Sequence, residues 1–105
     1  MMFKKYKIDI YRGGITLMKQ LYGKVNNPSG LTSRLSAELV AEANRTSCKV
    51  TLYSHDDEAD LKSIMNMMAL VIRHDEEFKI VIEGDTEEAV AKKFKKLLEE
   101  LNLLK

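Results

Sequence analysis

The sequence has one cysteine, one proline, no tryptophan and almost no net charge. The single cysteine, Cys48, excludes an internal disulfide and a zinc site built from cysteines. A formal charge of +1 over 105 residues provides no general basic field for nucleic-acid binding. No apolar run approaches the roughly 20 residues of a membrane span, and we expect no signal peptide. These absences predict one small cytoplasmic domain that contacts neither nucleic acid nor membrane directly.

Candidate catalytic and metal-binding residues are few. His55 and His74 have no partner three or four positions away of the kind that a metal site needs, so we interpret both as solvated turn residues. Cys48 alternates with Val50 and Leu52, which favours a buried structural thiol over a nucleophile. No glycine-rich phosphate loop is present. We therefore expect no metal, no cofactor and no catalysis by this chain.

Hydrophobic periodicity predicts an α+β domain. Alternating residues indicate strands over 19–25, 48–53, about 58–60 and 78–83. Helical spacing indicates helices over about 33–44, 64–72 and 86–104. Helices in this number would cover one face of an antiparallel sheet and leave the other face to solvent.

Polar residues mark where each helix begins. Thr32 or Ser33 offers a hydroxyl to cap the first helix, and Ser63 offers one for the second. For the third helix we expect Asp85 as the cap, with Glu88 at the third helical position.

A turn that feeds a helix, Gly30 to Arg34, is the first informative segment. Free backbone N–H groups and the helix dipole favour an anion at such a place, and Arg34 adds a charged fork. Ordinary capping explains the same residues, so both interpretations stay open.

The second informative segment, 63–72, is apolar almost all round. A two-layer domain buries only one side of a helix, so part of the set Ile64, Met65, Met67 and Met68 is expected at the surface, where methionines suit several partners. A short helix that is fully buried is the alternative. A phosphate on Ser63 would add roughly −1.5 to −2 charges beside this surface.

Three segments resemble HPr, the histidine-containing phosphocarrier family of the bacterial phosphoenolpyruvate-dependent sugar phosphotransferase system. Residues 60–65, Asp-Leu-Lys-Ser-Ile-Met, resemble the family's regulatory-serine segment. Residues 27–31, followed by Arg34, resemble the loop before the active-site helix, and 77–89 resemble the last strand and helix start. The resemblance covers 18–105 and implies an open-faced β-sandwich, with a four-stranded antiparallel sheet and three helices on one face.

One departure from the family pattern removes the carrier chemistry. The phosphorylated histidine of the family follows Gly-Leu, and Thr32 stands there in this sequence. A threonine phosphate would be a stable ester, so the resemblance implies a degenerate phosphocarrier site at Thr32, Ser33 and Arg34. Further departures are Leu35 at a family proline, and Asn66 and Val71 at family glycines.

Loss of the histidine with retention of Ser63 resembles the non-carrier branch of the family, the catabolite-repression HPr-like proteins. In that branch HPr kinase/phosphorylase phosphorylates the serine, and the phosphoprotein binds the catabolite control repressor. The resemblance implies Ser63 as phosphoacceptor, a docking patch at Ile64, Met65 and Met68, and Arg34 as a polar contact beside it. The alternatives are a divergent phosphocarrier in sugar transport that meets phosphotransferase-system enzymes, and a paralogue with a new partner. We expect a monomer or a weak dimer.

Residues 1–17 form an extension without a counterpart in the family. They carry four basic residues against one acidic residue, whereas the rest of the chain carries a charge of −2. Met18 begins the resemblance as a start codon would, so one hypothesis is that translation starts at Met18 and that residues 1–17 are a translated leader, or disordered, before a domain at 18–105. The alternative is an extra strand, because Tyr6, Ile8 and Ile10 alternate with Lys7 and Asp9.

Overall fold

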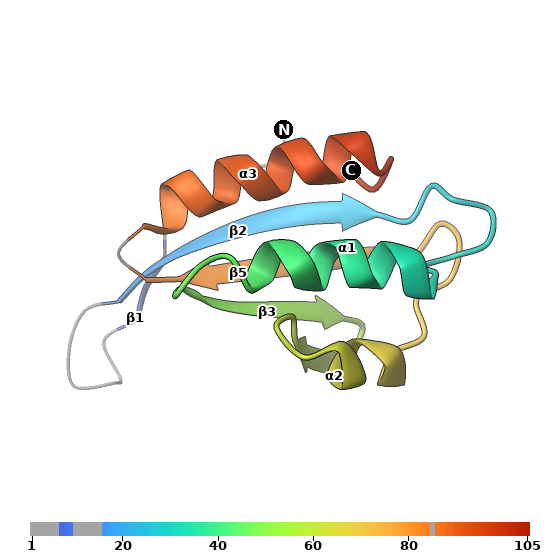
Figure 1. The fold of residues 1–105 in the computed structure, drawn as a ribbon, viewed down its shortest axis with the longest axis horizontal. Coiled ribbons are helices and arrows are strands. Elements are labelled where there is room, and N and C mark those ends of the chain that lie inside the picture. Colours follow the sequence, from blue (N-terminus) through green and yellow to red (C-terminus); the bar gives the residue numbers. More distant parts are fainter. Residues whose placement is uncertain (1–6, 10–15, 85) are drawn as a thin grey trace.

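The computed structural model describes residues 7–9, 16–84 and 86–105. One antiparallel sheet carries three helices on one face (Figure 1). The strand order is β1-β2-β5-β3-β4. The strands are β1 (Lys7–Asp9), β2 (Thr16–Lys24), β3 (Lys49–Ser54), β4 (Asp57–Asp60) and β5 (Glu77–Glu83), and the helices are α1 (Ser33–Ala43), α2 (Ile64–Ala69) and α3 (Glu87–Glu100). The predicted α+β open-faced sandwich is confirmed, with β2 to β5 as its four strands.

A fifth strand, β1, lies at the edge of the sheet. It pairs with the start of β2, where Lys7 lies opposite Met18. This is the position that the extra-strand alternative requires, although Tyr6 and Ile10 lie outside the described residues. Because β2 begins at Thr16, it crosses the predicted boundary of the domain. A start of translation at Met18 stays a prediction.

The core forms where alternate residues of the three central strands face the helices. Leu21, Ile80 and Leu52 lie side by side on β2, β5 and β3, and each is completely buried. Gly23 leaves room on β2 for the ring of Phe78, since an added Cβ would lie 2.1 Å from its Cζ. A larger residue at this position would displace the ring from a close-packed interior. No helix among the described residues is long and apolar enough to cross a bilayer.

The last helix ends earlier than predicted. We expected α3 to continue to Leu104, but it stops at Glu100, and Asn102 adopts a left-handed conformation with φ 58°. The N–H of Asn102 donates to Glu99 O and that of Leu103 donates to Leu98 O, which is the Schellman arrangement. Leu103 is fully buried, and Leu104 forms a β-bridge with Gly23.

The start of α3 also differs from the expected capping box. The N-cap is Thr86, whose side chain makes no capping hydrogen bond, and Glu88 is the second helical residue. Asp85, the cap that the sequence suggested, lies outside the described residues.

Candidate functional site

Ser63 caps the N-terminus of α2, as predicted. Its backbone is extended, with φ −108° and ψ 113°, and its Oγ accepts a hydrogen bond of 3.2 Å from the backbone N–H of Asn66. The residue is half-buried. The hydroxyl therefore lies at the boundary between the domain and solvent.

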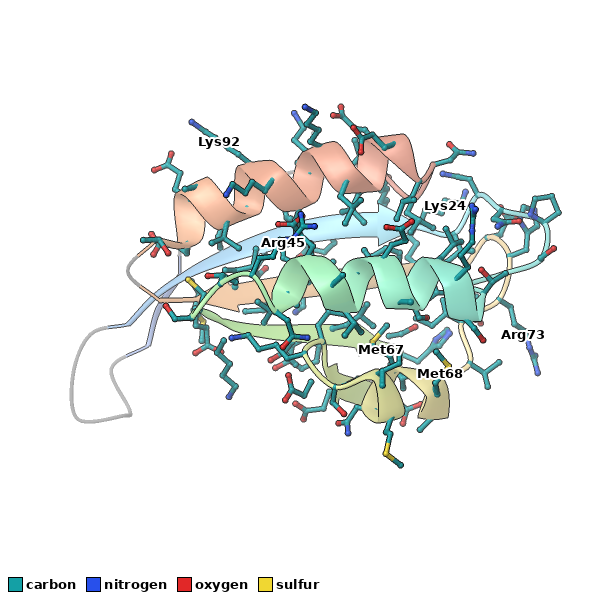
Figure 2. All side chains as sticks on the ribbon, viewed as in Figure 1. Lys24, Arg45, Met67, Met68, Arg73 and Lys92 are labelled. Atoms are coloured by element: carbon teal, nitrogen blue, oxygen red, sulfur yellow. The ribbon has the colours of Figure 1, made fainter. Side chains whose placement is uncertain are left out.

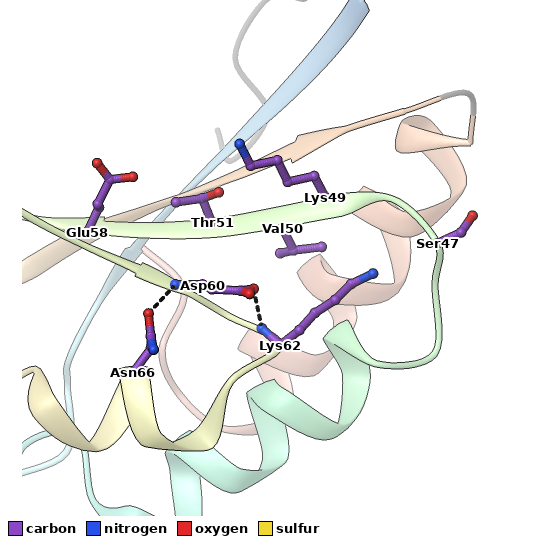
Figure 3. Close-up of a pocket in the computed structure, with 8 residues that line it drawn as sticks. All are labelled: Ser47, Lys49, Val50, Thr51, Glu58, Asp60, Lys62 and Asn66. Atoms are coloured by element: carbon purple, nitrogen blue, oxygen red, sulfur yellow. Dashed lines mark hydrogen bonds between the residues drawn. The ribbon is translucent and has the colours of Figure 1, made fainter.

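The segment before Ser63 is held from two sides. A carboxylate oxygen of Asp60 accepts from the N–H of Lys62 at 2.9 Å (Figure 3). The backbone oxygen of Asp60 accepts from the N–H of Ser63, also at 2.9 Å. The amide of Asn44, at the end of α1, donates to Lys62 O at 3.0 Å, and Lys62 Nζ donates to Thr46 O at 2.6 Å. These bonds to the end of α1 and the following loop fix the position of Ser63.

A shallow cavity of about 570 Å³ opens beside this segment, between β3, β4 and α2 (Figure 3). Its charged lining residues are Lys49, Glu58, Asp60 and Lys62. Two lysines and two carboxylates contribute to the lining, so its formal charges cancel and favour ligands of neither sign.

Exposed apolar side chains follow Ser63 directly and form what we call the α2 patch. It consists of Ile64, Met65, Met68 and Val71, whose exposed fractions are 40%, 79%, 45% and 73%. Met67, on the opposite side of the helix, is 1% exposed and belongs to the core (Figure 2 labels Met67 and Met68). The prediction of a partly exposed helix is confirmed, and the alternative of a fully buried one is wrong.

The second helix is shorter than the predicted span to Ile72. It ends at Ala69, and Leu70 is already extended with ψ 138°. The extended chain brings Ile72 O to the N–H of Leu31, at 2.9 Å. This hydrogen bond joins the end of the α2 patch to the loop before α1.

That loop leads into Thr32, Ser33 and Arg34, the residues at which the resemblance implied a degenerate phosphocarrier site. Thr32 is the N-cap of α1, and its Oγ1 accepts from the N–H of Leu35 at 3.3 Å, so the capping prediction is confirmed. Gly30 has φ 77° and lies so close to the α2–β5 loop that an added Cβ would be 2.9 Å from Ile72 O. Ser33 and Arg34 are exposed in the first turn of α1. Anion binding there stays a prediction.

Both histidines lie at this end of the domain. His74 lines the groove between the Thr32 loop and the α2–β5 loop, with Nδ1 3.1 Å from Asn27 O. A carbonyl oxygen only accepts, so Nδ1 carries the proton in this contact. His55 lies in the β3–β4 turn, with Nε2 2.8 Å from Glu76 Oε2. Both residues are exposed, as expected for turn histidines.

Glu76 accepts hydrogen bonds that lower the pKa of its carboxyl group. Its Oε1 accepts from the N–H of Arg73 at 2.6 Å. This bond, and then the bond with His55, hold the pKa of the Glu76 carboxyl below its ordinary value. The β3–β4 turn is thereby tied to the loop that supports Gly30.

Cys48 has the environment of a structural thiol. It is 3% exposed, and its Sγ lies 3.3 Å from Thr86 Oγ1. Burial alone raises the pKa of the thiol, but hydrogen bonds with Thr46 and Thr86 outweigh it, and the net pKa is lowered. In the part of the chain that the structure describes, no three histidine, cysteine or acidic side chains gather as metal ligands.

Comparison with known proteins identifies the family. The sequence model described as the PTS HPr component phosphorylation site matches residues 23–100. This chain belongs to the HPr family. It is 29% identical over 86 residues to the phosphocarrier protein HPr of Lysinibacillus sphaericus, which covers 82% of this chain and 98% of that protein. It is 34% identical over 76 residues to HPr of Mycoplasma genitalium, and the alignment covers 70% of this chain and 86% of that protein.

Solved HPr structures share the fold. A Mycoplasma histidine-containing phosphocarrier protein superposes with a TM-score of 0.77 at 26% identity, covering 82% of this chain and 98% of the other. A second similar structure is the catabolite repression containing protein Crh of Bacillus subtilis, which is described as a swapped, intertwined dimer. It superposes with a TM-score of 0.60 at 29% identity, covering 74% of this chain and 90% of the other. The HPr relatives are phosphocarriers rather than catalytic enzymes.

The structure places the predicted site residues on two helices that contact each other, α1 and α2, with the Ser63 segment anchored at the C-terminal end of α1 and Arg34 in its first turn. Ile64, Met65 and Met68 are exposed directly after Ser63, and Arg34 is exposed on the neighbouring α1. Sequence reasoning missed Val71 as part of the α2 patch, the side-chain bond of Asn66 to Ser63, and the groove at His74. Only the polar character of Asn66 in an apolar helix signalled any of these.

Proposed function

We propose that this chain is a regulatory member of the HPr family that acts through phosphorylation of Ser63 rather than by relaying phosphate. The observation that carries the proposal is the place of Ser63, a half-buried cap followed directly by the exposed α2 patch. A phosphate there puts a dianion beside apolar side chains. A partner with an Arg or Lys next to an apolar groove then distinguishes the two forms.

The replacement at Thr32 supports a regulatory rather than a carrier role. Thr32 offers a hydroxyl that caps α1, where the family places its phosphorylated histidine. A phosphate on that hydroxyl would be an ester, which does not pass its phosphoryl group on as a phosphoimidazole does. The partners in this proposal are HPr kinase/phosphorylase and a catabolite control repressor. Phosphotransferase-system enzymes are the partners of the alternative carrier role.

The test is intact mass after incubation with HPr kinase and ATP. We expect one acid-stable phosphate on the wild type and none on Ser63→Ala. Ser47→Ala, which changes an exposed serine that lines the cavity beside Lys62, should keep the phosphate. Labelling that persists in Ser63→Ala moves the regulatory site elsewhere. If the wild type takes no label while an ordinary HPr in the same reaction does, the result favours the alternative hypothesis of a paralogue with a new partner.

A further inference from the structure

The side chain of Asn66 holds the Ser63 hydroxyl from the first turn of α2. Its Nδ2 lies 3.2 Å from Ser63 Oγ, and the backbone N of the same residue also lies 3.2 Å away. Its Oδ1 lies 3.4 Å from the backbone N of Asp60, as the dashed line in Figure 3 shows. One amide therefore joins the end of β4 to Ser63.

These contacts fix which way the amide faces. The N–H of Asp60 only donates, so the atom opposite it is the carbonyl oxygen of Asn66. The amide NH₂ is then the group that faces Ser63, and it donates to Oγ. Both hydrogen bonds between Asn66 and Ser63 consequently end on the same oxygen.

A serine oxygen has two lone pairs, and Asn66 engages both of them. In phosphorylation, a lone pair of Oγ forms the new bond to the γ-phosphorus of ATP. The bond from that phosphorus to the ADP oxygen breaks, ADP leaves with the electron pair, and the hydroxyl proton passes to a base of the kinase. While the proton is still on the hydroxyl, both lone pairs are occupied, so one of the two hydrogen bonds to Oγ has to be released for the attack to begin.

We propose that the Asn66 side chain is a positioning residue that restrains phosphorylation of Ser63 by occupying a lone pair of its nucleophilic oxygen. The inference rests on the proposed function of Ser63. The backbone N–H remains with any residue at position 66, whereas the Nδ2 bond is specific to this chain's asparagine. A glycine, which the resembled family usually has at this position, leaves the second lone pair open.

The experiment compares the wild type with Asn66→Ala in single-turnover phosphorylation. HPr kinase is in excess over the protein, and kinase and ATP are both saturating. Neither docking nor product release then contributes to the measured rate. Asn66→Ala should be phosphorylated about two- to tenfold faster, the factor that corresponds to one hydrogen bond of ordinary net strength.

Asn44→Ala is the matched control. It removes another side-chain amide that holds the same segment, through Lys62 O at 3.0 Å, and it leaves both bonds to Ser63 Oγ in place. Its rate should stay within twofold of the wild type. Equal acceleration of both variants would assign the effect to a loosened segment and overturn the inference.

Further outcomes separate this inference from the proposed function. A labelled wild type with an equal or slower Asn66→Ala overturns the restraint alone. An unlabelled wild type beside a labelled Asn66→Ala supports a restraint strong enough to block the reaction. Absence of label from the wild type and both variants, beside a labelled ordinary HPr, overturns the proposed function and the restraint together.

Discussion

A hydroxyl and an imidazole differ in what they do at the start of α1. The Oγ1 of Thr32 accepts the N–H of Leu35 and completes the first turn of the helix. It has no nitrogen on which a labile phosphoramidate forms. Thr32 therefore caps the helix, and its side chain cannot form the phosphoimidazole of a carrier.

We expect no acid-labile phosphate on this protein after incubation with enzyme I and phosphoenolpyruvate, because position 32 lacks the nucleophilic nitrogen. The measurement is intact mass before and after acid treatment. An HPr that retains the histidine is the positive control in the same reaction. Stoichiometric acid-labile label on this chain would favour the alternative of a divergent phosphocarrier.

His74 shows what residue-level reasoning on the sequence missed. It is 47 positions from Asn27, yet its Nδ1 lies 3.1 Å from the carbonyl of that residue. Nothing in local spacing indicates this contact, because it depends on the pairing of β2 with β5. The caps at Thr32 and Ser63 were predictable, since the capping oxygen and the N–H that donates to it lie within three residues of each other.

At the scale of elements, ends of helices were harder to predict than their starts. The leucines after α3 keep helical spacing, so the sequence favoured a continuous helix to Leu104. The chain instead reverses at Asn102 and places Leu103 in the core. Burial of this one leucine, which depends on the sheet beneath, outweighs the local pattern.

Asn102→Ala should destabilise the fold, because alanine tolerates φ 58° less well than asparagine does. We expect a loss of about 1 kcal/mol in the free energy of unfolding. The melting temperature should then fall by about 4–8 °C. Asn102→Gly, which adopts this conformation freely, should melt at or above the wild-type temperature. Equal losses in both variants would mean that the asparagine side chain, and not its backbone conformation, carries the effect.

Glu76 joins the β3–β4 turn to the α2–β5 loop through its hydrogen bonds with His55 and Arg73. We expect the stability that these bonds contribute to depend on pH. The folded-state pKa of this carboxyl is lowered below 4.5 by the Arg73 N–H and then by His55. Its contribution to stability is therefore present above about pH 4.5 and is lost as the pH falls through the folded-state pKa.

Glu76→Gln keeps an acceptor for Arg73 but removes the titration. The difference in unfolding free energy between the wild type and this variant should be largest above about pH 4.5 and should shrink below it. Urea unfolding of both proteins between pH 3 and pH 7 measures this difference. A difference that does not change with pH would contradict the assignment of the shift to Glu76.

At the scale of the whole molecule, the end of the α2 patch lies next to the loop before α1. The hydrogen bond from Leu31 N to Ile72 O joins the loop that precedes Thr32 to the end of the α2 patch. The order of elements and the exposed side of α2 were predictable, because a single sheet covers only one side of each helix. The contact between the two loops was not, since it forms only when the sheet is complete.

We expect the exposed side chains of the α2 patch to contribute to binding of a partner and not to the stability of the fold. Met65→Ala and Met68→Ala should weaken binding of the Ser63-phosphorylated protein to a catabolite control repressor, because both side chains are exposed, at 79% and 45%. Neither variant should lose the phosphate or the cooperative melting transition.

Met67→Ala is the matched control, since this side chain is 1% exposed and its truncation should cost about 2–5 kcal/mol of stability. Calorimetric titration and melting curves of the three phosphorylated variants give both quantities. Loss of the melting transition in Met65→Ala and Met68→Ala would place these side chains in the core. Unchanged affinity in both would move the docking surface away from α2.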